Sequence, residues 1–263
     1  EKIQARSYQR SKTRFGLPHT NLPIVVAGAG PSLGAHIQFL RTHRSQFYLL
    51  AVDTAYSTLL QNEIQPDAVV VQESQFYNLY DFLTHPRIEC DLVADISSYP
   101  QVLRLAGEVK TAGSLYLFAS EFSKISLFQD LQSADLLPPL FPPLGSVGLT
   151  AVRAALHISN STIVISGLDF AFPAGQTHSR GTPRHQLSLL HNSRLLGLED
   201  MTSRTTKGVT PVPGVFDTSG QPLLSTPTLR RYADNFARIF GAMERILLLQ
   251  PRGLPLGIEE LSE

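Results

Sequence analysis

The stretch Ile24-Val-Val-Ala-Gly28-Ala-Gly-Pro-Ser-Leu33 decides the fold that we expect. Its first four residues are apolar and rich in β-branched side chains, as in a strand that is buried on both faces. The two glycines let the backbone turn tightly, and Pro31 suits the first turn of a helix. Apolar residues then recur at helical spacing, at Leu33, Ile37 and Leu40. The stretch therefore predicts a buried strand, a tight turn and an amphipathic helix.

The same alternation continues along the chain. Apolar runs at 47–52 and 68–71 predict two further strands, and a helix from 54 to about 62 is expected between them. Such a βαβαβ pattern with short connections is typical of a parallel sheet covered by helices. Further elements are expected as strands at 92–94, 115–119 and 162–166, and as helices at 75–83, 121–131, 146–157 and 227–249. We predict an α/β fold with a Rossmann-like, mostly parallel sheet, helices on both faces and a C-terminal helix.

The domain organisation follows from this pattern. Residues 23–257 are predicted to form one nucleotide-binding domain, preceded by a basic arm or helix over residues 1–22. Residues 172–226 are rich in Gly, Pro, Ser, Thr and His and show little regular periodicity, so we expect a lid or an insertion there. The chain starts without Met, which suggests a part of a longer product with further flanking regions.

Composition excludes several classes of protein. The chain has 263 residues, with 22 Lys plus Arg against 22 Asp plus Glu, so no general affinity for nucleic acid is expected. A single cysteine, Cys90, excludes an internal disulfide framework and agrees with a reducing compartment. No apolar run approaches the length of a membrane span, and no signal peptide is visible. We therefore expect a cytoplasmic protein without a membrane span.

The turn after the first strand is a candidate phosphate site. Amide groups at the start of a helix face the carboxyl end of the preceding strand and bind anions there. This site would consist of Gly28, Ala29, Gly30, Pro31 and Ser32. The turn has no Gly-Lys-Ser/Thr, and Leu33 replaces the third glycine of the dinucleotide-binding motif. The alternative is a strand–turn–helix corner with no ligand.

Acidic residues follow the next two strands on the same predicted edge. Asp53 and Thr54 end the second strand, and Glu73 follows the third. An acid in this place of a doubly wound sheet often reaches a ribose hydroxyl. Asp53 and Glu73 together could hold Mg²⁺ beside a nucleotide. Helix capping is the alternative for Asp53 or Thr54, and a solvated charge is the alternative for Glu73.

The second half of the chain carries two more candidate segments. Gly145 and Ser146 open a helix after a proline cluster and form a second candidate anion site. Gly167-Leu-Asp169-Phe170 follows a buried strand, and His178 comes shortly after it. His178 could act as an acid or base near neutral pH, although a loop histidine is more often merely solvated.

Taken in order, these segments resemble the MptE-like or motility accessory factor family of domains. The resemblance runs from about residue 23 to 257 and rests on Gly28–Leu33, Val52–Ala55, Pro66-Asp67 with its strand and acid, Gly145–Val147, and Ser166–Phe170 with Thr177-His178. One branch of this family comprises 6-hydroxymethylpterin diphosphokinases, which use ATP and Mg²⁺. The other comprises motility accessory factors, which are implicated in adding nonulosonic sugars to flagellin.

Two segments are also similar to bacterial sialyltransferases that use CMP-sugar donors. Their Gly-Asn-Gly-Pro-Ser-Leu loop corresponds to Gly28–Leu33, and their helix start and Gly-Ile-Asp-Phe turn correspond to Gly145-Ser146 and Gly167–Phe170. Ala29 stands where those enzymes have a donor-contacting Asn. Leu224-Ser-Thr226 stands where they have a catalytic His, whose role His178 could take over.

The resemblance implies a nucleotide-dependent transferase, with three readings of its activity. The first is transfer of a nonulosonic sugar from a CMP-sugar to a protein acceptor such as flagellin. In that reading the two helix starts hold the phosphate, Asp53 and Asp169 position the ribose or base, and His178 handles the acceptor proton. The second is an ATP-dependent diphosphokinase with Mg²⁺ on Asp53 and Glu73. The third is a non-catalytic nucleotide-binding or flagellar assembly module. No tightly bound cofactor is expected, because CMP-sugar or ATP would be a substrate and Mg²⁺ an optional partner.

Overall fold

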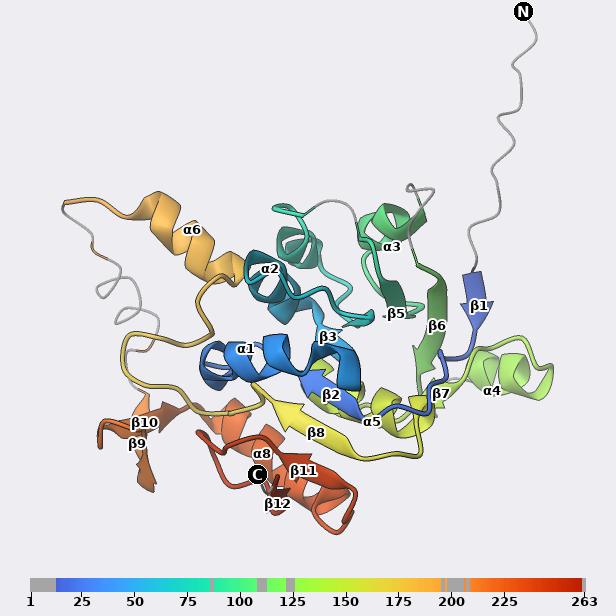
Figure 1. Cartoon of the computed structure of the whole chain (residues 1–263). Helices are drawn as coiled ribbons and strands as arrows, with labels where there is room; N and C mark the ends of the chain where they lie inside the picture. The colour runs from blue at the N-terminus through green and yellow to red at the C-terminus, as the bar shows by residue number, and fades with distance from the viewer. Residues whose placement is uncertain are drawn as a thin grey trace, which may run out of the picture.

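The protein is built on one large sheet in which every described pairing is parallel (Figure 1). The computed structural model describes residues 13–85, 88–107, 113–121, 126–194, 197, 206 and 209–261. The strands follow one another across the sheet as β1 (Thr13–Phe15), β6 (Leu115–Ser120), β5 (Asp91–Asp95), β4 (Ala68–Val71), β3 (Tyr48–Val52), β2 (Ile24–Ala27), β8 (Ile163–Ser166), β11 (Ile246–Leu248) and β12 (Glu259–Glu260), with β7 (Leu140–Phe141) beside β6.

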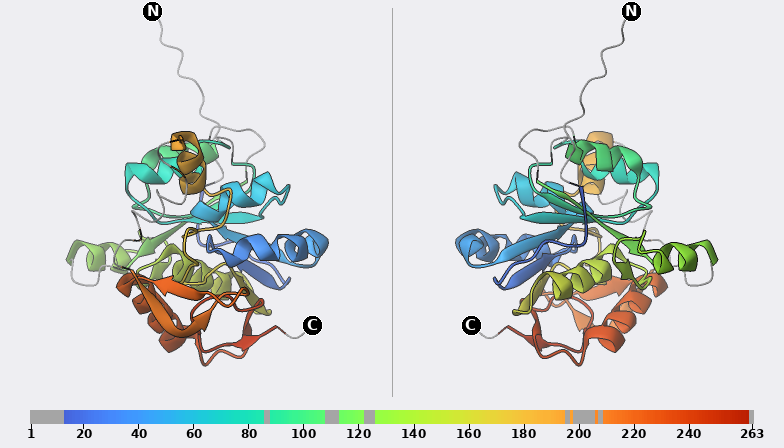
Figure 2. Two further views of the ribbon diagram at one scale, coloured as in Figure 1. Left: turned by 90° about the vertical axis from the view of Figure 1, so that its left-hand side faces the viewer. Right: turned by 90° about the vertical axis from the view of Figure 1, so that its right-hand side faces the viewer.

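Helices cover both faces of this sheet, so the predicted fold class is confirmed. From β2 to β6 the chain steps across the sheet in one direction, and from β2 to β8 and β11 it steps in the other. Right-handed crossovers therefore place α1 on one face and α5 and α8 on the opposite face, as Figure 2 shows. The helices are α1 (Ser32–Thr42), α2 (Asp53–Gln61), α3 (Pro100–Gly107), α4 (Ser126–Ser133), α5 (Val147–Ile158), α6 (Pro183–His191) and α8 (Pro227–Phe240), with short 3-10 helices η1 (Arg44–Gln46) and η2 (Phe76–Asp81).

The centre of the sheet is buried on both sides. All residues of β2, β4 and β8 are buried, and so are the last four residues of β3. This explains why these strands read as continuous apolar runs in the sequence, without alternation of polar side chains. Of the described residues, no helix has the length and apolar character that crossing a membrane requires.

The C-terminal helix is shorter than the sequence predicted. The expected helix over 227–249 ends at Phe240, and residues 246–248 form the strand β11 instead. Since β8 would otherwise be an edge of the sheet, the run Ile246-Leu-Leu-Leu249 is used to pair with it. The predicted helix at 75–83 is the 3-10 helix η2, and the predicted helix at 121–131 appears as α4, with residues 122–125 outside the described part.

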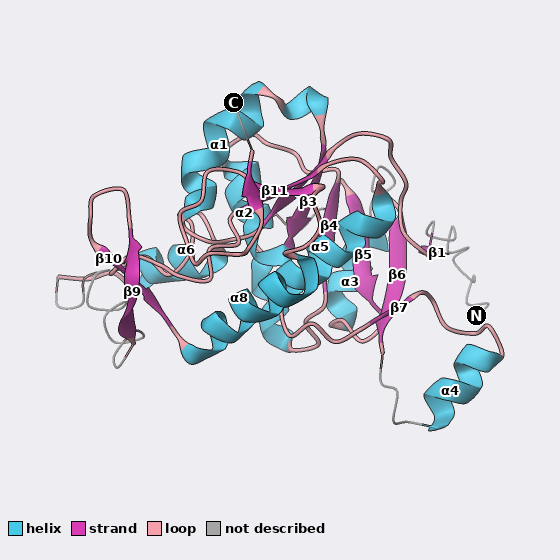
Figure 3. Cartoon of the chain, turned by 90° about the horizontal axis from the view of Figure 1, so that it is seen from below, coloured by secondary structure: helices cyan, strands magenta, loops and turns pink. Residues whose placement is uncertain are grey.

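Two other predicted regions contain more regular structure than expected. The arm proposed for residues 1–22 contributes the edge strand β1, and its first 12 residues lie outside the described chain. The segment 172–226 contains α6 and a hairpin of β9 (Thr210–Phe216) and β10 (Pro222–Ser225). This hairpin stands apart from the large sheet, at the same end of the molecule as α6 (Figures 1 and 3). Its role as a lid stays a prediction.

We predict that Gly28→Ala destabilises the fold, because the added Cβ would collide with the backbone of Gly167. The free energy of unfolding in urea should fall by about 2 kcal/mol or more, the cost of overpacking a tight backbone contact. Gly34→Ala is the matched control, since its Cβ would meet only the Ser179 hydroxyl at 3.6 Å. That control should be neutral or gain up to about 1 kcal/mol from helix propensity. Equal effects of the two changes would contradict the close approach of the loops.

Candidate functional site

The sheet reverses its strand order between β2 and β8, and a cavity opens at the carboxyl ends of these strands. In doubly wound folds this switch point is where ligands bind, because the loops on its two sides diverge. The cavity has a volume of about 360 Å³. Its walls come from the loop after β2 (Ala29–Pro31), the start of α2 (Thr54), the start of α5 (Ser146–Gly148), the loop after β8 (Gly167–Phe172), the segment with Thr177, His178 and Arg184, and the start of α8 (Thr226, Leu229).

The loops after β2 and β8 touch each other through their backbones at the base of this cavity. The Gly28 amide donates to the Ser166 carbonyl at 2.7 Å, and the Gly30 amide donates to the Gly167 carbonyl at 2.8 Å. Gly167 has a φ of +71°, a conformation that glycine adopts without strain. A Cβ on Gly30 would meet the Asp169 carboxylate at 2.5 Å. Gly28, Gly30 and Gly167 therefore allow the two backbones to approach closely. Of these three glycines, Gly30 and Gly167 also line the cavity.

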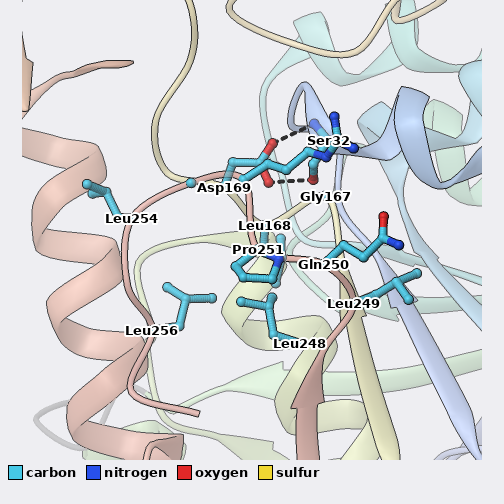
Figure 4. Close-up of a pocket in the computed structure, with 12 residues that line it drawn as sticks. Ser32, Gly167, Leu168, Asp169, Leu248, Leu249, Gln250, Pro251, Leu254 and Leu256 are labelled. Carbon is cyan, nitrogen blue, oxygen red and sulfur yellow. Dashed lines mark hydrogen bonds between the residues drawn. The ribbon is translucent and has the colours of Figure 1, made fainter. Parts of the chain in front are cut away.

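Asp169 closes the N-terminus of α1. Figure 4 shows its carboxylate turned toward Ser32, whose amide donates to Oδ2 at 2.7 Å and whose hydroxyl donates to Oδ1 at 2.5 Å. Burial raises the pKa of Asp169 to about 6, although the two Ser32 hydrogen bonds and the charge of Arg252 oppose the shift. Behind the carboxylate lies a void of only about 10 Å³. The protein's own carboxylate thus occupies the Ser32 end of the first predicted anion site.

The second predicted anion site lies at the start of α5 and faces the cavity. Ser146 is the N-cap, and its hydroxyl accepts from the Gly148 amide at 3.1 Å. Gly145 has a φ of +86° and packs against the Tyr232 ring, so it shapes the turn without lining the cavity. The positive end of the α5 dipole is directed at the space between Ser146 and Gly148, which is a favourable place for a phosphate.

His178 lies on the cavity wall together with Arg184. Its ring is exposed there, and its Nδ1 is 3.1 Å from the Thr177 hydroxyl. Neighbouring protein atoms remove part of the water around the ring. This desolvation lowers the pKa of His178, and the charge of Arg184 lowers it further. The neutral imidazole, which can accept a proton, is therefore the favoured form at neutral pH.

The acids predicted to hold ribose or metal, Asp53 and Glu73, accept hydrogen bonds from other groups of the protein. Asp53 is buried, and its Oδ1 accepts from the Thr54 amide at 2.8 Å while its Oδ2 accepts from Asn78 at 2.7 Å. Asn78 also donates to Asp81 at 3.1 Å, and burial raises the pKa values of both Asp53 and Asp81, the latter to about 8. Glu73 is exposed, and its Oε1 accepts from the Gln75 amide at 3.0 Å.

Neither Asp53 nor Glu73 lines the cavity, so this arrangement does not fit a magnesium ion shared with a ligand there. Nowhere in the described chain do three or more His, Cys, Asp or Glu side chains gather in a way that could hold a metal ion. The metal role of these two residues stays a prediction, and no step below depends on it.

The structure brings most of the predicted site residues to one cavity. Those that line it are Ala29, Gly30, Pro31, Thr54, Ser146, Gly167, Asp169, Phe170 and His178. Those that lie outside its lining are Gly28, Ser32, Asp53, Glu73 and Gly145. Sequence reasoning missed Arg184 and Thr226. A signal was available for both, because Thr182-Pro-Arg184 and Thr226-Pro227 are each a helix start within the segment that contains or borders the proposed lid.

The fold and the cavity define a Rossmann-like α/β protein with a cavity at its switch point. Within that class, the chain belongs to the MptE-like family. The family model described as "6-hydroxymethylpterin diphosphokinase MptE-like" matches residues 3–175. The resemblance found in the sequence is thereby confirmed.

Similar proteins include longer chains from two bacteria. Two uncharacterized proteins of Treponema pallidum (strain Nichols) are each 32% identical, over 237 residues (89% of this chain, 39% of the relative) and over 141 residues (52% and 36%). The solved structure of the MAf glycosyltransferase from Magnetospirillum magneticum AMB-1 matches 96% of this chain and 35% of its own, with a TM-score of 0.61 and 16% identity. At that identity the likeness concerns the fold. The chain spans less than two fifths of each of these proteins.

We predict that Asp169→Asn removes a pH dependence of stability. The folded-state pKa of about 6 lies above the ordinary value of 3.8, so the folded state binds more protons between these values. The contribution of Asp169 to wild-type stability should therefore fall as pH rises from about 4 to 6, by about 3 kcal/mol in total, and stay level above that. Asn keeps an acceptor for the Ser32 amide and does not ionise.

The measurement is urea unfolding of both proteins from pH 4 to 7.5. The free-energy difference, variant minus wild type, should grow through this window, since contributions of the other groups cancel. Asp217→Asn serves as the control, because hydrogen bonds from Ser219 and Gln221 lower the pKa of Asp217, so its difference from wild type lacks that rise. A level difference for Asp169→Asn would show that Asp169 is not a buried, proton-binding carboxyl.

Proposed function

We propose that the chain is a nucleotide-sugar-dependent glycosyltransferase domain of the motility accessory factor type. The donor would be a CMP-activated nonulosonic sugar, and the acceptor a hydroxyl of a protein such as flagellin. The observation that carries the proposal is the cavity at the switch point, which is lined by a helix start, by Arg184 and by His178, whose imidazole is neutral at neutral pH. The fold shared with the MAf glycosyltransferase supports it.

The donor phosphate would bind at the start of α5. Ser146, Val147 and Gly148 border the cavity with the positive end of the helix dipole, and Arg184 adds a formal charge from the opposite segment. At the α1 start, by contrast, Asp169 already bonds to the Ser32 amide, and a second anion there would meet its charge. We therefore place the phosphate at α5 and leave the nucleoside to the loop of Ala29–Pro31 and to Thr54.

His178 would act as the general base. The acceptor hydroxyl oxygen attacks the anomeric carbon of the sugar while His178 takes the hydroxyl proton. The bond between the anomeric carbon and the phosphate oxygen breaks, and its electron pair stays on CMP, whose charge α5 and Arg184 stabilise. Thr177, 3.1 Å from Nδ1, would orient the ring so that Nε2 is the proton acceptor. Thr226, on the same wall, occupies the stretch where the sialyltransferases have their catalytic histidine.

A diphosphokinase is the second candidate, and the description of the matching family favours it. That reaction would move a pyrophosphate group from ATP to a pterin alcohol in the same cavity. The expected metal ligands, Asp53 and Glu73, do not line that cavity and are hydrogen-bonded to Thr54, Asn78 and Gln75, which counts against this candidate. The third candidate, a nucleotide-binding module without catalysis, shares the site and differs only in lacking turnover.

Nucleotide binding separates these candidates. We predict that CMP raises the melting temperature without Mg²⁺, with a stabilisation of about 2.7 kcal/mol at a concentration 100 times its Kd. The measurement is a thermal shift with CMP, CTP, ATP and GTP, each with and without Mg²⁺. Stabilisation by ATP that requires Mg²⁺ would favour the diphosphokinase instead. If no nucleotide shifts the melting temperature, both enzymatic proposals fail.

A charge-removing pair of variants tests the phosphate position. Arg184→Gln should weaken CMP binding by about tenfold, because a charge-assisted contact to phosphate is lost. Arg104→Gln is the control, since Arg104 is exposed on α3 and bonds only to Gln101 among the described residues. Equal CMP affinity in the two variants would place the phosphate elsewhere.

We predict that His178→Gln lowers kcat by about 100-fold or more, the usual share of a general base, with CMP affinity unchanged. Because the pKa of His178 is lowered, wild-type activity should persist below the ordinary histidine value of 6.5. Turnover of a CMP-sugar followed across pH measures both effects. An unchanged kcat, or an acid limb above pH 6.5, would remove His178 from the mechanism.

A further inference from the structure

A group of four aromatic rings, two of them exposed, lies on η2 and the loop after β5. We call this group, which consists of Phe76, Tyr77, Tyr80 and Tyr99, the aromatic platform. Phe76 is 52% exposed and Tyr77 is 71% exposed. The Phe76 ring centroid lies 5.7 Å from that of Tyr80 and 5.9 Å from that of Tyr99, and Tyr77 stacks on Tyr80 at 6.2 Å. Contiguous exposed aromatic surface of this kind marks an interaction site.

The backbone beneath the platform is held in place by hydrogen bonds. The Glu73 carboxylate accepts from the Gln75 amide at 3.0 Å, and the Glu73 carbonyl accepts from the Tyr99 amide at 3.0 Å. Asn78, buried within η2, donates to Asp53 and Asp81. These bonds tie the loops after β4 and β5 together. The rings are therefore presented outward by a braced segment, which lowers the entropy cost of binding a partner.

The platform and the cavity lie along the same carboxyl edge of the sheet. η2 packs between α2 and α3, and Asn78 bonds to Asp53 at the start of α2. The neighbouring residue, Thr54, lines the cavity. Since adjacent strands are about 4.8 Å apart, loops after β4 and β5 lie within about 10 Å of the loop after β3. An acceptor bound on the platform can thus reach the cavity with a few residues of extended chain.

The charge around the platform selects the kind of partner. In the sequence, residues 45–103 contain a single Lys or Arg, Arg87, which lies outside the described part of the chain. The next basic residue, Arg104, is exposed on α3 and donates to Gln101 of the same helix. Glu73, which precedes the rings in the sequence by three residues, is exposed and supplies the carboxylate of this segment. Tyr and Phe faces attract cations, and a carboxylate beside them adds to that attraction. The same charge disfavours nucleic acid and anionic lipid.

We propose that the aromatic platform binds a polypeptide segment of the acceptor that carries Lys or Arg next to an apolar residue. This inference rests on the proposed function, because it assigns the protein acceptor of that reaction to a surface. The basic side chain packs over Tyr77 and Tyr80 toward Glu73, the apolar side chain packs on Phe76, and the modified hydroxyl follows a few residues later in the cavity.

The test starts from a random 12-residue peptide library on phage, selected on the whole chain. Recovered peptides should be enriched in Lys or Arg beside aromatic or aliphatic residues. One recovered peptide is then labelled and its Kd measured by fluorescence anisotropy. Tyr77→Ala should raise this Kd about tenfold or more, as for an interface hot spot. Glu73→Gln, which keeps an acceptor for the Gln75 amide, should raise it less, and added salt should weaken wild-type binding.

Leu136→Ala is the matched control, because Leu136 is 61% exposed and belongs to no part of the platform. It should leave the Kd unchanged, and Tyr77→Ala should leave CMP binding and the melting temperature unchanged. The proposal is overturned if no peptide is recovered, if the peptides are acidic, if Tyr77→Ala binds equally well, or if sedimentation with phosphatidylserine vesicles shows membrane binding that depends on Tyr77. None of these outcomes involves turnover, so failure here is distinguishable from a failure to bind CMP.

Discussion

The approach of two backbone loops at the switch point, after β2 and after β8, is the constraint on which the site depends. The loops exchange hydrogen bonds from Gly28 to Ser166 and from Gly30 to Gly167, at a separation that leaves no room for a Cβ. From β2 the chain adds strands β3 to β6 on one side of the sheet, and β8 and β11 lie on the other side. The contact between the loops after β2 and β8 therefore joins the two halves of the sheet. It also sets the floor of the cavity, so that fold stability and ligand geometry rest on the same glycines.

Asp169 makes the two helix starts at the cavity differ in charge. A helix N-terminus attracts anions, and two such starts, at α1 and α5, face the same edge of the sheet. At α1 the protein supplies its own anion, since the Asp169 carboxylate takes both the amide and the hydroxyl of Ser32. At α5 the capping group is the neutral hydroxyl of Ser146, which keeps the dipole uncompensated by formal charge. An anionic ligand of the kind proposed would therefore bind at α5 rather than be shared between the two helix starts.

The sequence predicted the helices and strands, and the edge of the sheet at which the candidate residues lie, better than it predicted the hydrogen-bond partners of those residues. The alternation of apolar runs at 24–27, 47–52 and 68–71 with helical segments between them was sufficient for the parallel sheet, because each run is a local signal. The pairing of Ser32 with Asp169 spans 137 positions, and nothing local distinguishes a carboxylate that caps a distant helix from one that meets a ligand. Residues 246–249 were assigned to a helix because their apolar run fits either period. Only the open side of β8 makes them a strand.

The net charge of zero is compatible with a phosphate-binding cavity in this arrangement. The phosphate is assigned to the helix dipole of α5 with Arg184, so the cavity needs little formal positive charge. Along the same edge, Asp53 and Asn78 bond the start of α2 to η2, and the surface beyond them carries the exposed rings of Phe76 and Tyr77 and the carboxylate of Glu73. An anionic donor and a basic acceptor segment would therefore be drawn to adjoining regions of opposite character. Such a separation keeps the acceptor from competing with the donor, which a uniformly basic edge would not do.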